Sequence, residues 1–345
     1  MEHDPQTLDV AAVDAYLTAH LPGYFGPLTA TKFSDGQSNP TFLLKAGSGS
    51  YVLRRKPPGV LLKSAHAVDR EFRVQQALAG TDVPVAQMHC LCEDDDIIGS
   101  SFYVMQHVPG RIFFDPRLPE VGKAERSLII NDMNRVLAAL HSVDIDAVGL
   151  SDFGPPGNYI GRQTARWSKQ YFASETGEIP EMNRLISGLQ ERLEGDEGGG
   201  ERTLVHGDYR IDNMIFSPDE PRCLAVLDWE LSTIGHPLAD LASVIMQWRM
   251  PPGLDGRGLD GVDRADLGLP SDMEFIASYC DRRGIPGIDN FGFYLGFCFF
   301  RMAAVLQGVK KRALDGNASN PERGLKMGAY VPDFAAKGLE ALTHG

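Results

Sequence analysis

A short segment near the middle of the chain, LVHGDYRIDNMIF (residues 204–216), places charged side chains between two apolar runs. Its polar residues are His206, Asp208, Arg210, Asp212 and Asn213. The apolar runs are typical of short buried strands, and burying a charge without a partner costs several kcal/mol. The carboxylates of this segment therefore need a neutralising partner, and a divalent cation with its phosphates is one such partner.

The residues that follow predict a β-hairpin that would complete a metal site. In NMIFSPDEPRCLAVLDW (213–229), NMIF and CLAVLD are the strands, and the turn between them contains two prolines. Antiparallel pairing brings Asn213, at the start of one strand, close to Asp228, at the end of the other. Amide and carboxylate oxygens suit Mg²⁺. Asp208, five residues before Asn213, is then a carboxylate that could stay off the metal and act as a base.

The elements around this segment change character along the chain. The runs TFLLKA (41–46) and YVLRRK (51–56) flank the turn GSGS and predict a hairpin. A helix is predicted over residues 64–80 and two or three more strands over 82–110, which gives a small sheet of about five strands. Apolar residues at helical spacing dominate the rest, beginning with residues 123–143.

Composition excludes several classes of function. The 345 residues are long for one core, and the net charge of −13 argues against a nucleic-acid partner. The five cysteines include no C-x-x-C pair, and the N-terminus has no signal-peptide pattern, so we expect reduced thiols and a cytoplasmic protein. The apolar stretch FGFYLGFCFF (291–300) is too short to span a bilayer, which favours a buried core helix and no membrane contact.

The spacing D-x-x-x-x-N, followed by an Asp at the end of the next strand, is the catalytic-loop and metal-site pattern of protein kinases. Here it is HGDYRIDN followed by LDWE. With DREF, LAALHSVD and GHPLADLA, these motifs resemble the aminoglycoside phosphotransferase family, and most of all its subgroup fused to acyl-CoA dehydrogenases. The resemblance covers nearly the whole chain. It implies an α+β, bilobal protein-kinase-like fold with an antiparallel N-lobe sheet plus helix and a mostly helical C-lobe.

The resemblance also implies two lobes with different roles. Residues 1–107 would form the N-lobe with the nucleotide-binding sheet. Residues 108–345 would form the C-lobe with the catalytic loop, the metal site and the substrate-binding helices. In the C-lobe, Asp208 resembles the catalytic base and Arg210 the cation that neutralises the γ-phosphate. Asp240, in GHPLADLA, is expected to brace the catalytic loop.

The implied ligands of Mg²⁺ are Asn213 and Asp228, and hydrogen bonds at the end of the hairpin are the alternative role for both residues. The implied ATP contacts are Gly36, Ser38, Asn39, Arg54, Glu71, Gln106 and Val108. The stretch SDGQSNPTF (34–42) is not a G-x-G-x-x-G loop, and an ordinary turn is the alternative. Arg54 stands where the family has a lysine that pairs with a helix glutamate, here Glu71. The register could differ by one residue, because Arg55 follows directly.

The implied activity is transfer of the γ-phosphate of ATP, with Mg²⁺, to a hydroxyl of a small molecule. Two substrate classes stay open: a hydroxyacyl-CoA-like compound, and an aminoglycoside-like or choline-like amine. The alternative function is a pseudokinase that serves as a nucleotide-binding or scaffold module. The sequence leaves the oligomeric state open.

Overall fold

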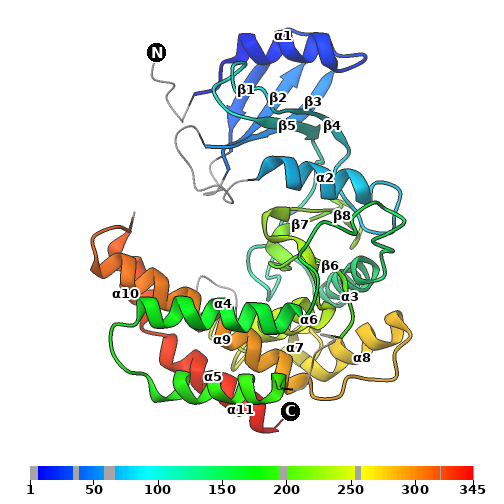
Figure 1. Ribbon diagram of the computed structural model, residues 1–345. Coiled ribbons are helices and arrows are strands. Elements are labelled where there is room, and N and C mark those ends of the chain that lie inside the picture. Colours follow the sequence, from blue (N-terminus) through cyan, green and yellow to red (C-terminus); the bar gives the residue numbers. More distant parts are fainter. Residues whose placement is uncertain are drawn as a thin grey trace. The chain divides into compact units, whose positions relative to one another are not determined.

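The computed structural model describes residues 7–33, 39–57, 67–194, 200–252, 258–318 and 320–344. The chain divides into two compact units, whose elements Figure 1 labels. Unit 1 comprises Met1–Phe113, Ala147–Leu150 and Ile211–Ser232. Unit 2 comprises Phe114–Asp146, Ser151–Arg210 and Thr233–Gly345.

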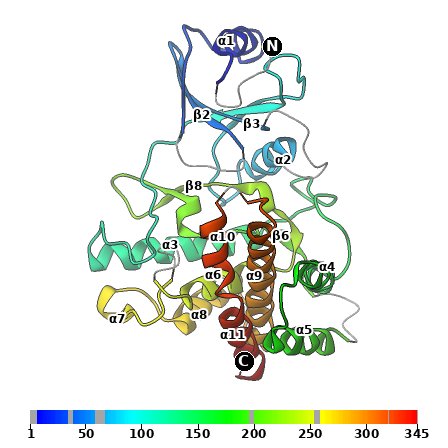
Figure 2. The ribbon, with the colours of Figure 1, turned by 90° about the vertical axis from the view of Figure 1, so that its left-hand side faces the viewer.

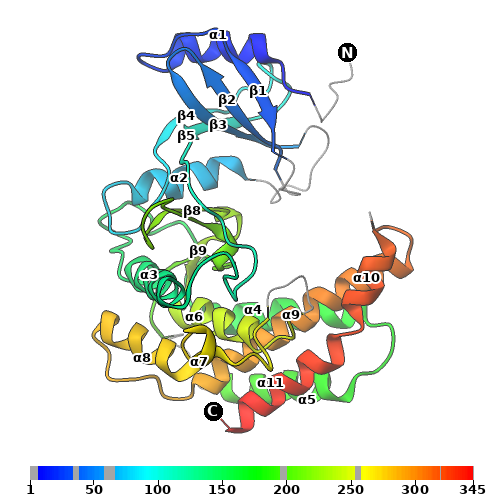
Figure 3. The ribbon, with the colours of Figure 1, turned by 180° about the vertical axis from the view of Figure 1, so that it is seen from behind.

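Unit 1 is built on an antiparallel five-stranded sheet with the order β1-β2-β3-β5-β4 (Figure 3). The strands are β1 (Thr29–Lys32), β2 (Thr41–Ala46), β3 (Gly49–Arg55), β4 (Met88–Cys92) and β5 (Phe102–Gln106). The predicted hairpin over 41–56 is confirmed, because β2 pairs with β3 from Thr41 opposite Arg54 to Ala46 opposite Gly49.

A helix covers each face of this sheet. Helix α1 (Val10–His20) packs against one face, where Val13 and Leu17 belong to the same buried cluster as Phe102 and Val104 of β5. Because side chains alternate along a strand, Tyr103 faces away from that cluster and toward α2 (Val68–Leu78). The sheet therefore has an apolar face and a face that carries polar groups.

The predicted hairpin at the centre of the sequence is present and belongs to unit 1. It consists of β7 (Met214–Phe216) and β8 (Cys223–Val226), with Met214 opposite Val226. Two short helical turns flank it, η1 (Ile211–Asn213) and η2 (Trp229–Leu231). Arg111 and Phe216 exchange two backbone hydrogen bonds of 2.8 Å, and the Val226 N–H donates to Pro84 O.

This grouping differs from a single lobe boundary at 107/108. The hairpin lies far along the chain but shares its hydrogen bonds with segments before residue 112. Local sequence does not reveal these long-range bonds, and the boundary implied by the resemblance placed the hairpin in the second lobe. The lobe assignment itself stays a prediction.

Unit 2 is mostly helical and includes a second, two-stranded sheet formed by β6 (Thr203–Val205) and β9 (Thr233–Gly235). Its helices are α3 (Lys123–His141), α4 (Tyr159–Ser174), α5 (Pro180–Leu193), α6 (Pro237–Trp248), α7 (Arg264–Leu267), α8 (Asp272–Arg283), α9 (Phe291–Leu314), α10 (Pro321–Gly328) and α11 (Val331–His344). Helix α9 packs against α4, α6, α10 and α11 (Figure 2). The mixed helix and sheet composition confirms the predicted α+β class.

The apolar stretch over residues 291–300 is the first part of α9, which continues past Arg301 to Leu314. By length and composition α9 could cross a membrane, but 61% of its most apolar window is buried inside the protein. That burial agrees with the predicted core helix. All five cysteines are free thiols, as the sequence predicted.

Candidate active site

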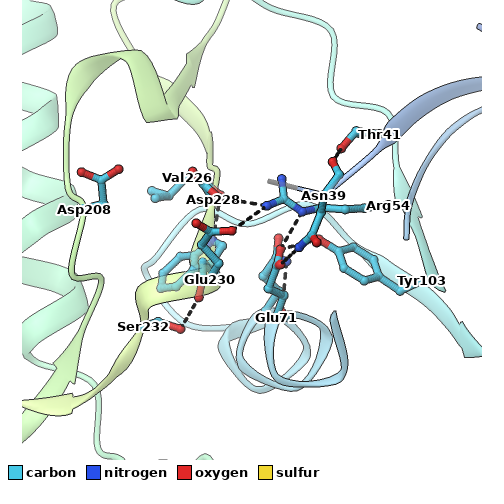
Figure 4. Close-up of polar contacts among 12 residues, drawn as sticks. Asn39, Thr41, Arg54, Glu71, Tyr103, Asp208, Val226, Asp228, Glu230 and Ser232 are labelled. Atoms are coloured by element: carbon cyan, nitrogen blue, oxygen red, sulfur yellow. Dashed lines mark hydrogen bonds and ion pairs between the residues drawn. The ribbon is translucent and has the colours of Figure 1, made fainter. Parts of the chain in front are cut away.

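Arg54 is the centre of a polar cluster in unit 1 (Figure 4). Its Nε lies 2.9 Å from Glu71 Oε2, and its Nη2 lies 3.0 Å from Asp228 Oδ1. Glu71 also accepts hydrogen bonds from Asn39 Nδ2 at 2.8 Å and from the Tyr103 hydroxyl at 3.1 Å. Because Glu71 is held from three sides, it can fix the Arg54 guanidinium in one position.

The fold also decides which arginine of β3 reaches this cluster. Arg55 points to the opposite face of the sheet, where it is buried, donates to Thr7 O at 2.9 Å and lies over the Phe42 ring. Arg54 and Glu71 are therefore the pair that the structure brings together. The contribution of Arg54 to ATP binding stays a prediction.

Burial has a clear electrostatic consequence for Glu71, whose side chain is 1% exposed. Burial raises the pKa of Glu71 to about 7, and the attraction of Arg54 only partly opposes this shift. The pair is thus fully ionic only above neutral pH. A carboxyl that titrates near neutrality makes the net charge of the Arg54–Glu71 pair depend on pH.

Asp228 and Asn213 lie at the same end of the β7–β8 hairpin, as the sequence predicted. The Leu227 N–H donates to Asn213 O at 2.8 Å, which ties the two ends of the hairpin together next to Asp228. Asp228 adopts the left-handed region, with φ 62° and ψ 61°. Aspartate and asparagine tolerate this region better than most residues. The Asp228 carboxylate is therefore held at the end of the hairpin without a large cost in backbone strain.

The donor set suits a hard cation. Among the described residues no group of three or more His, Cys, Asp or Glu side chains is arranged to hold a metal ion. Mg²⁺ is usually held by one or two carboxylates together with waters and substrate phosphates. Asp228 and Asn213 would supply one carboxylate and one amide oxygen, and Arg54 beside Asp228 shows that a positive charge is favourable there. The residues therefore fit Mg²⁺ that arrives with phosphates.

The loop from His206 to Arg210 belongs to unit 2, and Asp240 of α6 holds it. The Asp240 carboxylate accepts the backbone N–H of His206 at 2.6 Å and that of Gly207 at 2.9 Å. Gly207 has a φ of 83°, a conformation that glycine adopts without strain. The bracing role predicted for Asp240 is confirmed by these bonds.

Buried histidine completes the brace. Nε2 of His141 lies 3.5 Å from Asp240, while its Nδ1 lies 2.8 Å from the Tyr279 hydroxyl. Burial lowers the pKa of His141, which favours a neutral ring. Burial alone would raise the pKa of Asp240, but its contacts with His141 and the His206 N–H hold that pKa below the usual value. The brace is therefore an ionised carboxylate that accepts hydrogen bonds.

Asp208 and Arg210 form an ion pair within this loop, with 3.1 Å between Asp208 Oδ2 and Arg210 Nη2. The Asp208 side chain is 33% exposed, so it is accessible to solvent. Tyr209, between them, is buried and donates its hydroxyl to Met133 O at 2.7 Å. This anchor fixes the backbone of the loop between its two charged residues.

The remaining predicted ATP contacts have different outcomes. Gly36 and Ser38 lie outside the described residues. The Asn39 side chain is 1% exposed and bonded to Glu71, so a phosphate contact from Asn39 would have to come from its backbone. Gln106 is the last residue of β5 and its N–H donates to Gln87 O. Within the described residues no hydrogen bond involves Val108. Its predicted contact with the adenine of ATP stays a prediction.

Two residues of the cluster were not predicted. Tyr103 lies opposite Arg54 in the β3–β5 pairing, a register that the sequence does not reveal. Glu230 is the last residue of the LDWE motif, and its Oε2 lies 3.6 Å from Arg54 Nη2. The motif itself was a signal for Glu230, because it places a second carboxylate two residues after Asp228.

Comparison with known proteins now decides the family. The model of the phosphotransferase enzyme family matches residues 29–281, most of the chain. The chain belongs to the phosphotransferase enzyme family. The arrangement of Arg54, Glu71 and Asp228 agrees with membership of this family.

Curated relatives of this phosphotransferase are much longer proteins. The chain is 47% identical to acyl-CoA dehydrogenase family member 10 of Mus musculus over 90% of its length, and 44% identical to member 11 of Rattus norvegicus over 96%. It spans only 29% and 43% of the length of these two relatives. The predicted resemblance to the dehydrogenase-fused subgroup is confirmed.

Solved structures confirm the kinase-like fold of this phosphotransferase. A Ralstonia eutropha protein assigned as an aminoglycoside phosphotransferase matches with a TM-score of 0.89 and 46% identity, covering 98% of this chain and 99% of the other. An aminoglycoside phosphotransferase crystallised with AMP-PNP and hygromycin B matches with a TM-score of 0.64 over 97% of this chain and all of its own. At 16% identity, the second likeness supports the fold alone.

Proposed function

We propose that this phosphotransferase transfers the γ-phosphate of ATP, in the presence of Mg²⁺, to a hydroxyl group of a small molecule. The observation that carries the proposal is the Arg54 guanidinium, fixed between Glu71 and Asp228. A cation held this way can bind phosphate oxygens with its fork of N–H groups. Nucleotide-bound relatives with the same fold support ATP as the donor.

Each residue of the site then has a defined task. Arg54 orients the phosphates, and Glu71 with Tyr103 holds Arg54 in place. Asn213 and Asp228 would hold Mg²⁺, which neutralises phosphate charge when it is bound. Because Arg210 is joined to Ile211 by a peptide bond, the loop that carries Asp208 leads directly into the turn that ends at Asn213.

Asp208 is the proposed general base. Its carboxylate accepts the proton of the acceptor hydroxyl while the hydroxyl oxygen forms a bond to the γ-phosphorus. The bond between that phosphorus and the β–γ bridging oxygen breaks, and ADP leaves with the bonding electrons. Arg210, paired with Asp208 at 3.1 Å, can shift toward the charge that develops on the transferred group.

The acceptor class and the location are also proposals. The names of the curated relatives favour a hydroxyl on an acyl chain over an aminoglycoside-like or choline-like amine. The free cysteines fit a cytoplasmic location.

The direct test is a panel of hydroxyl compounds with ATP and Mg²⁺, scored by coupled release of ADP. Acceptor-dependent ADP release that stops when Mg²⁺ is removed is the expected result. Nucleotide binding without transfer to any acceptor would favour the pseudokinase instead.

A further inference from the structure

We propose that Arg301 selects an acceptor that carries an anionic group, a carboxylate or a phosphate, and that it binds this group next to Asp208. The inference rests on the proposed function, since it names the substrate class of the same site. It is carried by the contacts of the Arg301 guanidinium within unit 2.

Arg301 lies in the middle of α9, beside the catalytic loop. Its Nη2 is 3.5 Å from the carbonyl oxygen of Gly207, the residue directly before Asp208. On the other side its Cζ lies 5.9 Å from the centroid of the Phe297 ring. A hydrogen bond of 3.5 Å is at the outer limit of the usual range. The guanidinium is thus placed near the base but is weakly held.

Comparison with the other enclosed arginines of unit 2 shows that such weak contacts are unusual. Arg210 and Arg264, each less than 20% exposed, have carboxylate oxygens at 3.1 and 2.6 Å. Arg283, 10% exposed, pairs with Glu201, and Arg126 has no ion pair but donates to two backbone carbonyl oxygens, Leu118 O at 2.8 Å and Leu267 O at 3.4 Å. For Arg301, no carboxylate of the described residues lies within ion-pair distance, and its polar partners among them are the weakly placed Gly207 O and the Tyr159 hydroxyl.

The donors of Arg301 are therefore available to a ligand. A guanidinium presents five N–H groups in a rigid fork that matches a carboxylate or a phosphate. Taking a cation partly out of water without a partner is unfavourable, so an anion that fills this position gains affinity. Tyr159, a buried residue at the start of α4, contacts Arg301 through its hydroxyl and leaves the remaining N–H groups of the guanidinium for a ligand.

Electrostatics near the base points in the same direction. Burial alone would lower the pKa of Arg301, but Tyr159, Cys298, Asp240 and Asp208 raise it overall, so the group stays charged. Asp208 thus has one guanidinium paired with it, that of Arg210, and a second close enough to interact through charge. A polycationic acceptor such as an aminoglycoside would meet these like charges, whereas an anionic acceptor would be attracted.

The test is a matched series of acceptors whose binding is measured by calorimetry without nucleotide. The compounds form three sets, with chains of about four, six and eight carbons. Within a set, every compound has the same chain length and a hydroxyl at one end. The other end is a carboxylate, a phosphate monoester, a second hydroxyl or an ammonium group. The proteins are the wild type, Arg301→Gln and Arg301→Lys. The control is Arg166→Gln, which removes one exposed charge from α4.

We expect the wild type to bind an anionic member more tightly than the diol of equal length, and the ammonium member least. Arg301→Gln should lose this preference, by roughly 10- to 100-fold, while diol binding changes little. Arg301→Lys should keep part of the preference for anions, and Arg166→Gln should keep all of that preference. The carboxylate and phosphate arms identify which anion is bound.

Three outcomes would overturn the inference: no preference for anions in the wild type, including no binding at all; a preference that survives in Arg301→Gln; or equal losses for every member with a lower melting temperature. In the second of these outcomes, a weaker affinity of Arg301→Gln for AMP-PNP would place Arg301 on the nucleotide instead. Selective binding of anions without phosphate transfer would contradict the proposed function alone.

Discussion

Arg54 and Asp228, 174 positions apart in the chain, form an ion pair with 3.0 Å between Nη2 and Oδ1. The same guanidinium contacts Glu71 through Nε. Asp228 is thus neutralised by a side chain at the position where the proposed mechanism places a metal ligand. Asp228 would hold Mg²⁺ when a nucleotide binds, and Arg54 would then be able to turn from Asp228 to the phosphate oxygens.

Asp228→Asn should remove the effect of Mg²⁺ on nucleotide binding. Asparagine tolerates the left-handed backbone at this position, so the fold should be kept while the carboxylate is lost. We expect wild-type protein to bind AMP-PNP more tightly with Mg²⁺ than without it, and Asp228→Asn to bind equally in both conditions. Calorimetry measures both affinities, and the exposed Asp219, changed to Asn, is the matched control. A variant that still responds to Mg²⁺ would remove Asp228 from the metal site.

Arg54 and Glu71 should act as one unit in nucleotide binding. Replacement by side chains of similar volume, Arg54→Met and Glu71→Gln, breaks the pair from either side. Because both changes disrupt the same contact, the double variant should lose less free energy of AMP-PNP binding than the two single losses combined, by about 0.5–3 kcal/mol. Lys45→Met, in β2 of the same sheet, provides a control cation. Additive losses would show that the pair does not contribute as a unit.

The free energy of unfolding should depend on pH because Glu71 titrates. Its pKa is raised to about 7 in the folded state from an ordinary value of 4.5. A raised pKa contributes stability that is fully present below the unfolded pKa and is lost as pH rises through the folded pKa. The unfolding free energy of wild type relative to Glu71→Gln should therefore fall between about pH 5 and pH 8, by on the order of 2–3 kcal/mol.

Denaturant unfolding of both proteins at several pH values measures this difference. Subtracting the Glu71→Gln curve removes the titration of every other group that the substitution leaves unchanged. A difference that is constant with pH, or that rises, would mean that Glu71 is ionised throughout and that Arg54 outweighs burial.

Parts of the site could be predicted because they depend on local sequence. The strands around Asn213 and Asp228 are joined by a short turn, and a short hairpin leaves little choice of register. Their convergence followed from that. The brace by Asp240 followed from the family motif, and the bonds to His206 and Gly207 confirmed it.

Other parts depend on pairings that local sequence does not contain. A shift of one residue turns every side chain of a strand to the other face, so the choice between Arg54 and Arg55 needed the β3–β5 register. Two further partners of Glu71 also depend on the fold: Tyr103 is set by the same register, and Asn39 lies 32 positions away in the chain. The position of the hairpin in unit 1 depends on bonds to Pro84 and Arg111, and no periodicity encodes those. In the sequence Arg301 simply follows the apolar run 291–300, and its contact with Gly207 is visible only in the fold.

The central claim is that Asp208 removes the proton of the acceptor hydroxyl, and Asp208→Asn tests it most directly. The substitution keeps the size of the side chain and one acceptor oxygen but loses the basicity. The measurement is steady-state transfer to an acceptor found by the panel, with thermal melts of both proteins and Asp219→Asn as control. We predict a fall in kcat of roughly 10²–10⁴-fold, an unchanged KM for ATP and an unchanged melting temperature. A variant that keeps near wild-type kcat would contradict the account, and so would one whose lost activity follows entirely from a lower melting temperature.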